Sequence, residues 1–185
     1  MSPLFFFQDL ESQRESAHLI AVDLGYSEKN RSCGLAWSGC SKPIQLRFGA
    51  AVSEVASRLN DQTRPLLVLE AVLSSLHNSS GDPAIRGTFE TGRGWYWGPG
   101  AVSALAAQRF LSQLAPLLHE PVLLAEAFLS NKLKKTAHRE DAATIVREFD
   151  EATPVLLDSA VMPLLSLISG VPPVRVFPIG GAYAR

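Results

Sequence analysis

Two short apolar runs that each lead into a carboxylate place the strongest constraint on the fold. Residues 18–25 are apolar up to Asp23 and end in Gly25, and residues 66–69 lead directly into Glu70. A continuous apolar run of this length, bounded by turn residues, is typical of a strand that is buried on both faces of a sheet. Both runs therefore predict central strands of an α/β sheet, each with an acid near its carboxyl end.

Patterns between and after these runs predict the other elements of the domain. Two apolar segments, 33–37 and 44–50, are separated by turn residues and predict antiparallel neighbours of the first strand. Capping residues and helical spacing predict a helix from Ser53 to Asp61, a helix over Pro99 to Glu120, a strand over Pro121 to Phe128, and a helix that Thr136 caps and that runs through Phe149. The predicted order is βββαβαβα, with five strands in one mixed sheet.

The remaining segments are predicted from their glycine, proline and aromatic content. Residues 74–100 contain many chain-breaking residues and predict a long loop. Residues 155–168 predict a C-terminal helix, and residues 171–179 predict an extended tail. Residues 5–7 are three phenylalanines that we expect to cover the domain's own core.

Length and composition predict one globular domain. The chain has 185 residues, of which 46% are hydrophobic and 19% charged, so one domain over residues 1–185 is expected, with its core at about residues 18–152 and a C-terminal helix and tail in residues 153–185. Cys33 and Cys40 lack the spacing of a redox pair or a zinc site and are expected to be free thiols. No apolar run reaches the ~20 residues that a membrane span needs. We expect a cytoplasmic protein without membrane contact.

The positions of the acids resemble those of the ribonuclease H-like superfamily over about residues 19–149. Acids end the first and fourth predicted strands, and another lies at the start of the last core helix. The segment His138-Arg-Glu-Asp141-Ala-Ala looks like the His-x-x-Asp that begins this helix in Holliday-junction resolvases of the RuvC type. Three more segments look like those of a largely uncharacterised family of predicted ribonuclease H-like nucleases: Glu70-Ala-Val-Leu-Ser, Gly92-Arg-Gly-Trp-Tyr-Trp-Gly-Pro-Gly100 and Glu126-Ala-Phe-Leu-Ser.

The resemblance implies a metal-dependent nuclease that hydrolyses phosphodiester bonds. Two Mg²⁺ or Mn²⁺ ions ~4 Å apart can activate a water and neutralise the charge that develops on the phosphate, and such hard cations prefer carboxylate oxygen. Asp23 would bridge the two ions, and Glu70 and Asp141 would each hold one, with Glu126 as a fourth acid. His138, one helical turn before Asp141, would orient water or phosphate.

Each of these residues also has a purely structural interpretation. Asp23 can cap a turn, and Asp141 can complement the N-terminus of its helix, in which case Glu140 beside it can be the ligand. Glu126 can form a salt bridge instead of a metal contact. His138 can be a solvated residue at the start of its helix.

Two groups of residues are candidates for nucleic-acid contacts, although the formal net charge of -1 gives no overall attraction to nucleic acid. The first group lies in the predicted loop and could stack on bases or contact phosphates, or could attach the loop to the domain: Arg86, Arg93, Trp95, Tyr96 and Trp97. The second is a basic cluster before the last core helix that could contact phosphate or be solvated: Lys132, Lys134, Lys135 and Arg139. Resolvases of this type form dimers, so the resemblance leaves a homodimer and a monomer both open.

Two other functions compete with the nuclease. A catalytically inactive descendant would keep the fold as a binding or scaffold module. A nucleotide-binding domain is the third hypothesis, because Asp23-Leu-Gly-Tyr-Ser27 looks like the first phosphate loop of the actin, Hsp70 and sugar-kinase group. Those proteins need two such domains, and this sequence contains no convincing second phosphate motif.

Overall fold

The computed structural model describes residues 4–6, 18–71, 73–76, 98–120, 122–129, 136–151, 161–163 and 176–179. Seven strands form one mixed sheet: β1 (Leu4–Phe6), β2 (His18–Asp23), β3 (Cys33–Trp37), β4 (Ile44–Leu46), β5 (Pro65–Glu70), β7 (Val122–Leu129) and β9 (Val176–Ile179). Two further strands form a separate antiparallel pair: β6 (Ser74–Leu76) and β8 (Val161–Pro163). The α-helices of the described residues are α1 (Phe48–Asn60), α3 (Pro99–Leu114) and α4 (His138–Glu151).

The five strands at the centre of the fold follow the order β4-β3-β2-β5-β7. The pairs β4–β3 and β3–β2 are antiparallel, whereas β2–β5 and β5–β7 are parallel. The predicted α/β class, the five-stranded core and its order βββαβαβα are therefore confirmed. The antiparallel meander and the adjacency of the two strands that carry Asp23 and Glu70 are confirmed as well.

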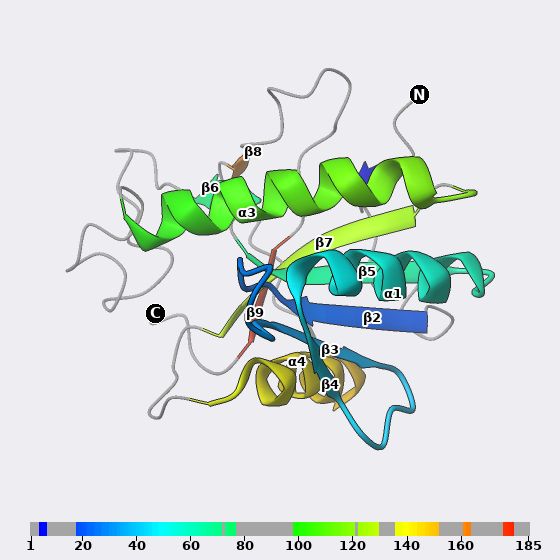
Figure 1. The fold of residues 1–185 in the computed structure, drawn as a ribbon. Coiled ribbons are helices and arrows are strands. Elements are labelled where there is room, and N and C mark those ends of the chain that lie inside the picture. The colour runs from blue at the N-terminus through cyan, green and yellow to red at the C-terminus, as the bar shows by residue number, and fades with distance from the viewer. Residues whose placement is uncertain are drawn as a thin grey trace.

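Helices cover the two faces of the sheet unequally, as Figure 1 shows. Helices α1 and α3 lie on one face, here called the α1/α3 face, where Ile20, Val22, Leu67 and Leu69 belong to the larger apolar core. Helix α4 lies on the opposite face, here called the α4 face, where the intervening strand residues pack in a second core: Leu19, Ala21, Leu66 and Val68. The alternation follows from the two-residue period of a strand.

Helix α1 begins at Phe48, five residues before the predicted start at Ser53, and β4 is correspondingly shorter than the predicted strand over 44–50. The apolar stripe of the helix extends back to Phe48, which is 1% exposed and whose ring meets the ring of Phe110 edge-on. The side chain of the N-cap residue Arg47 does not form a capping hydrogen bond. Instead, the Gly49 N–H donates to Glu28 Oε2 at 3.2 Å. The cap comes from a residue 21 positions away, so no local capping pattern marks the true start.

Helix α3 begins at Pro99 as predicted but ends at Leu114 rather than at Glu120. A 3₁₀ turn, η4 (Ala115–Leu117), follows it and contains Pro116. Proline has no backbone N–H and its ring clashes with the preceding turn, so the α-helix cannot continue through this position.

The helix predicted over 155–168 is wrong for the three described residues of that range, because β8 pairs there with β6. The loop predicted over 74–100 likewise begins with β6. The extended tail is confirmed for Val176–Ile179, which forms β9 and pairs in parallel with the outer edge of β7. Strand β1 contains Leu4 and two of the three phenylalanines that were expected to cover the core, Phe5 and Phe6. It pairs in parallel with another part of the same edge of β7. No helix among the described residues is long and apolar enough to cross a membrane.

Candidate active site

Asp23 and Glu70 lie side by side at the carboxyl ends of β2 and β5. The two strands are parallel, and Asp23 is the direct register partner of Glu70. Neighbouring strands lie about 4.8 Å apart, and both residues share the strand period of Leu19 and Leu66, which pack on the α4 face. The Leu24 N–H donates to the Glu70 carbonyl at 3.4 Å and continues the pairing past the two acids. Two carboxylates from separate strands therefore meet on the face that α4 covers.

Asp141 lies in the first turn of α4 and is buried at 4% exposure, while Asp23 is buried at 2%. These two are the buried charged or polar side chains of the described residues. The Thr136 hydroxyl donates a short hydrogen bond to Asp141 Oδ1. Thr136 is therefore not the N-cap that the sequence predicts; the Ala137 carbonyl accepts from the N–H groups of Glu140 and Asp141, so the helix begins one residue later.

The structure separates the roles of Glu140 and Asp141. The Ala137 N–H donates to Glu140 Oε2 at 3.2 Å, so Glu140 is the exposed partner in the cap of α4. Asp141, one residue later, points its carboxylate into the buried side of the same turn, next to Ala142 in the core of the α4 face. Of the two adjacent acids, Asp141 has the location that a ligand in a shared site needs.

His138 connects α4 to Asp23. Its Nδ1 lies 3.0 Å from Asp23 Oδ1, and its side chain is 41% exposed. Gly34 makes this approach possible, because Gly34 is the register partner of Asp23 on β3, and a β-carbon built on Gly34 would overlap the backbone of His138 and Arg139. The start of α4 thus contacts the strand backbone directly. This close packing places His138 at the carboxyl end of β2.

The thiol of Cys33 lies on the α1/α3 side of the sheet, close enough to Asp23 to feel its charge. It belongs to the larger apolar core and donates to the Gly25 carbonyl at 3.1 Å. Burial raises the pKa of the Cys33 thiol to about 11, and the negative charge of Asp23 acts in the same direction. Cys33 and Cys40 are both free thiols, as predicted.

The donor set has the chemistry of a site for Mg²⁺ or Mn²⁺, because it consists of carboxylate oxygens. In the described part of the chain, however, no group of three or more histidine, cysteine or acidic side chains is arranged to hold a metal ion. The Asp23 carboxylate contacts His138, and the Asp141 carboxylate contacts Thr136.

The other predicted site residues are only partly described. Glu126 is the register partner of Leu69, one step before the pair formed by Ala127 and Glu70, so its position in β7 differs from that of Glu70 in β5. Arg139 is exposed in the first turn of α4. The remaining predicted nucleic-acid contacts lie outside the described residues: Arg86, Arg93, Trp95, Tyr96, Trp97, Lys132, Lys134 and Lys135.

Sequence reasoning missed Thr136 as a partner of Asp141 and Gly34 as the point where α4 contacts the sheet. A hydroxyl five residues before an acid has no recognised spacing, and the glycine lies in a strand that gives no other sign of a close approach. A glycine inside an apolar strand does indicate that a backbone or ligand comes near, and this signal could have identified Gly34. Comparison of the chain with family models, curated proteins and solved structures gives no match.

Proposed function

We propose that this protein is a metal-dependent nuclease with a ribonuclease H-like fold. One observation carries the proposal: Asp23 and Asp141 are the buried charged side chains of the described residues, and Asp23 is in register with Glu70. Burial of a carboxylate is costly unless a partner compensates for the lost water. Asp23 and Glu70, which lie side by side at one sheet edge, repel each other when both are charged, so a cation that they share with Asp141 would explain the location of these acids.

The topology supports the same proposal. The order β4-β3-β2-β5-β7, with two antiparallel pairs followed by two parallel pairs, is similar to the arrangement expected for the ribonuclease H-like superfamily. The acids lie at the ends of the first and fourth strands of this core and at the start of its last helix. These are the positions at which the resemblance to the superfamily implies the acids of the site.

In this proposal Asp23, Glu70 and Asp141 hold Mg²⁺ or Mn²⁺. Bound ions of this kind would activate a water and neutralise charge on the scissile phosphate. His138 Nδ1 holds the Asp23 carboxylate in place before metal binds, and its partly exposed ring can then carry a proton to or from a group at the site. Thr136 performs the corresponding positioning role for Asp141.

Three carboxylate-to-amide variants test the proposal. Asp23→Asn and Asp141→Asn each remove one negative charge from the site, while Glu140→Gln is the matched control because its amide oxygen can still accept from the Ala137 N–H. Mn²⁺ binding is measured by calorimetry, and cleavage is measured on single-stranded, duplex and branched substrates in Mg²⁺ or Mn²⁺. We expect both aspartate variants to lose at least tenfold in Mn²⁺ affinity and to lose cleavage, and Glu140→Gln to behave like the wild type.

The same experiment distinguishes the nuclease from an inactive binding module. A wild-type protein that binds no Mn²⁺ and cleaves none of these substrates would contradict the nuclease and favour the module. Equal losses in folded Asp141→Asn and Glu140→Gln proteins would show that Glu140 contributes to metal binding as much as Asp141. Circular dichroism of each variant establishes that the fold is retained.

A further inference from the structure

The segment between β2 and β3 forms an exposed basic ridge with the start of α1. Three cations contribute to it: Lys29 and Arg31 from the β2–β3 loop and Arg47 from the N-cap of α1, all of them exposed. We name these three residues the basic ridge. In the described part of the chain, none of their side chains has an ion-pair partner, so the three charges face solvent. The ridge is distinct from the basic cluster singled out in the sequence, which precedes α4.

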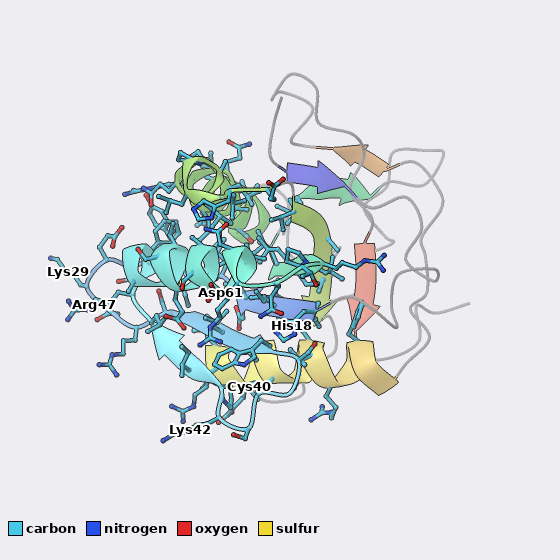
Figure 2. All side chains as sticks on the ribbon, turned by 90° about the vertical axis from the view of Figure 1, so that its right-hand side faces the viewer. His18, Lys29, Cys40, Lys42, Arg47 and Asp61 are labelled. Atoms are coloured by element: carbon cyan, nitrogen blue, oxygen red, sulfur yellow. The ribbon has the colours of Figure 1, made fainter. Side chains whose placement is uncertain are left out.

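Backbone contacts fix the loop against α1 and hold the ridge together. The Phe48 N–H donates to the Ser27 carbonyl at 3.0 Å, and the Gln45 side-chain amide donates a short hydrogen bond to the Arg31 carbonyl. Within the loop, the Asn30 N–H donates to Ser27 Oγ at 2.8 Å. Lys29 and Arg47 lie side by side in Figure 2, in agreement with these contacts. These contacts therefore hold the backbone that carries Lys29 and Arg31 against the start of α1, next to Arg47.

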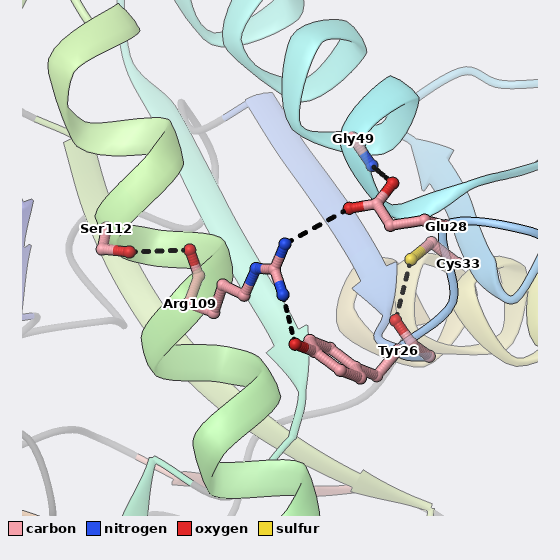
Figure 3. A network of polar contacts seen from close by, with 7 residues as sticks. Tyr26, Glu28, Cys33, Gly49, Arg109 and Ser112 are labelled. Carbon is pink, nitrogen blue, oxygen red and sulfur yellow. Dashed lines mark hydrogen bonds and ion pairs between the residues drawn. The ribbon is translucent and has the colours of Figure 1, made fainter.

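The one acid of this loop is compensated from two sides. Glu28 accepts from the Gly49 N–H and forms an ion pair of 3.6 Å with Arg109 of α3, as Figure 3 shows. Arg109 also donates to the Tyr26 hydroxyl. The loop thus presents its positive charges to solvent while its negative charge is paired. A surface with this balance attracts a polyanion although the whole protein has a net charge of -1.

The location of the ridge relates it to the candidate active site. The loop begins immediately after Asp23, at the carboxyl end of β2, where Glu70 also lies. Tyr26, three residues after Asp23, is 53% exposed, although its ring meets the Phe48 ring edge-on at 5.3 Å and the Arg109 guanidinium lies 5.2 Å from the ring centre. The exposed part of such a ring can stack on a base of a single strand. We infer that the basic ridge binds the phosphate backbone of a single nucleic-acid strand and directs it toward the acids. This inference rests on the proposed nuclease function and names the surface that holds its substrate.

Binding without metal tests this inference separately from catalysis. Fluorescence anisotropy of a labelled single-stranded oligonucleotide is measured in EDTA at several salt concentrations, on the full chain and on its Asp23→Asn variant. We expect Lys29→Glu and Arg47→Glu each to weaken binding about tenfold and to reduce the slope of log affinity against log salt by about one.

Lys42→Glu is the matched control, because it makes the same charge change on an exposed loop lysine at the other end of the sheet. The turn before β4 that carries Lys42 lies beside the start of β2, where the Ser38 N–H donates to the Leu19 carbonyl at 2.9 Å, and Figure 2 shows Lys42 apart from Lys29 and Arg47. We expect this variant to lose less than twofold. Similar losses in Lys42→Glu and Lys29→Glu would overturn the inference, as would tighter binding of a duplex than of the single strand.

Competition and cleavage complete the design. Displacement of the oligonucleotide by micromolar inorganic pyrophosphate would show a site for small phosphates and would also overturn the inference. Loss of binding in the ridge variants, with wild-type binding but no cleavage in Mn²⁺, would support the ridge and contradict only the nuclease. Cleavage by the wild type, together with unchanged binding in the ridge variants, would support the nuclease and contradict the ridge.

Discussion

The two faces of the sheet differ in what they bury. The α1/α3 face packs large side chains, among them Phe48, Phe110 and Leu59, against the strands. The α4 face packs a larger share of small ones, since five of the eleven buried residues in its core are alanines: Ala21, Ala36, Ala125, Ala127 and Ala142. The two buried acids, Asp23 and Asp141, also lie with α4. The α1/α3 face therefore provides the larger apolar core. The α4 face brings the start of α4 close to the sheet edge that carries Asp23 and Glu70.

This division has an energetic reason. Full burial of a phenylalanine or leucine side chain contributes about 1.5–3 kcal/mol, so the α1/α3 face can stabilise the domain without the acids. Small side chains and Gly34 let the first turn of α4 contact β3, where its N–H groups and positive dipole end favour nearby negative charge. Stability and the candidate site therefore depend on opposite faces of the sheet, which can be changed separately.

The largest expected effect is a loss of stability on the α1/α3 face. Phe110 is 0% exposed and its ring lies 5.7 Å from that of Phe48. We expect Phe110→Ala to lower the free energy of unfolding by about 3–5 kcal/mol through lost burial and a cavity. Urea denaturation with a constant m-value measures the change. Phe149→Ala is the matched variant on the α4 face, where Phe149 is 7% exposed, and its loss should be smaller. An equal or larger loss in Phe149→Ala would show that the α4 face contributes as much to stability as the α1/α3 face.

The next effect concerns the contact between β3 and the start of α4. A β-carbon on Gly34 overlaps the His138 carbonyl, so Gly34→Ala must shift the helix. We expect a loss of about 1–3 kcal/mol in stability, together with a loss of Mn²⁺ affinity, because His138 and Asp141 move with the helix. Gly49→Ala serves as the control, since its β-carbon would meet only Glu28 Oε2, at 3.4 Å, and it should change stability by less than ~1 kcal/mol. Unchanged Mn²⁺ binding in a folded Gly34→Ala protein would show that metal binding does not depend on the close contact between β3 and the start of α4.

The sequence was most informative where a local pattern of neighbouring residues determines the structure. The apolar runs before Asp23 and Glu70 predict two buried strands, and strand period then predicts that both acids share a face once the strands are parallel neighbours. The location of Asp141 in the first turn of α4 followed from the apolar spacing of that helix. These local patterns predicted the core order and the adjacency of Asp23 and Glu70, whereas a metal site shared with Asp141 is still a prediction.

The errors arose where distant residues decide the outcome. Glu28 caps α1 from another loop, so the helix begins at Phe48 without a local signal. Pairing with β6 makes Val161–Pro163 a strand within a segment that has a helical apolar pattern. Gly34 and Thr136 act through contacts that only the assembled sheet and helix create. Tertiary contacts of this kind override local propensity.

The smallest effect concerns the two thiols and tests whether the α1/α3 face is closed to solvent. Cys33 is 0% exposed and Cys40 is half-buried. Burial raises the pKa of the Cys33 thiol from 9.0 to about 11, so at pH 8 almost none of it is the reactive thiolate. We expect iodoacetamide to modify Cys40 in the folded protein and Cys33 only after unfolding in urea, as read by mass spectrometry of the two peptides.

The same raised pKa predicts a dependence of stability on pH. The folded state holds the Cys33 proton more tightly than the unfolded state, so this contribution to stability is complete below pH 9 and is lost as the pH rises toward 11. Other groups that titrate in this range contribute equally to wild type and Cys33→Ala, and the difference between their unfolding curves isolates the thiol. The difference should change only above pH 9. Modification of Cys33 at pH 8 as fast as Cys40 would show that the α1/α3 face opens to solvent, and its role as the stable side of the sheet would then be wrong.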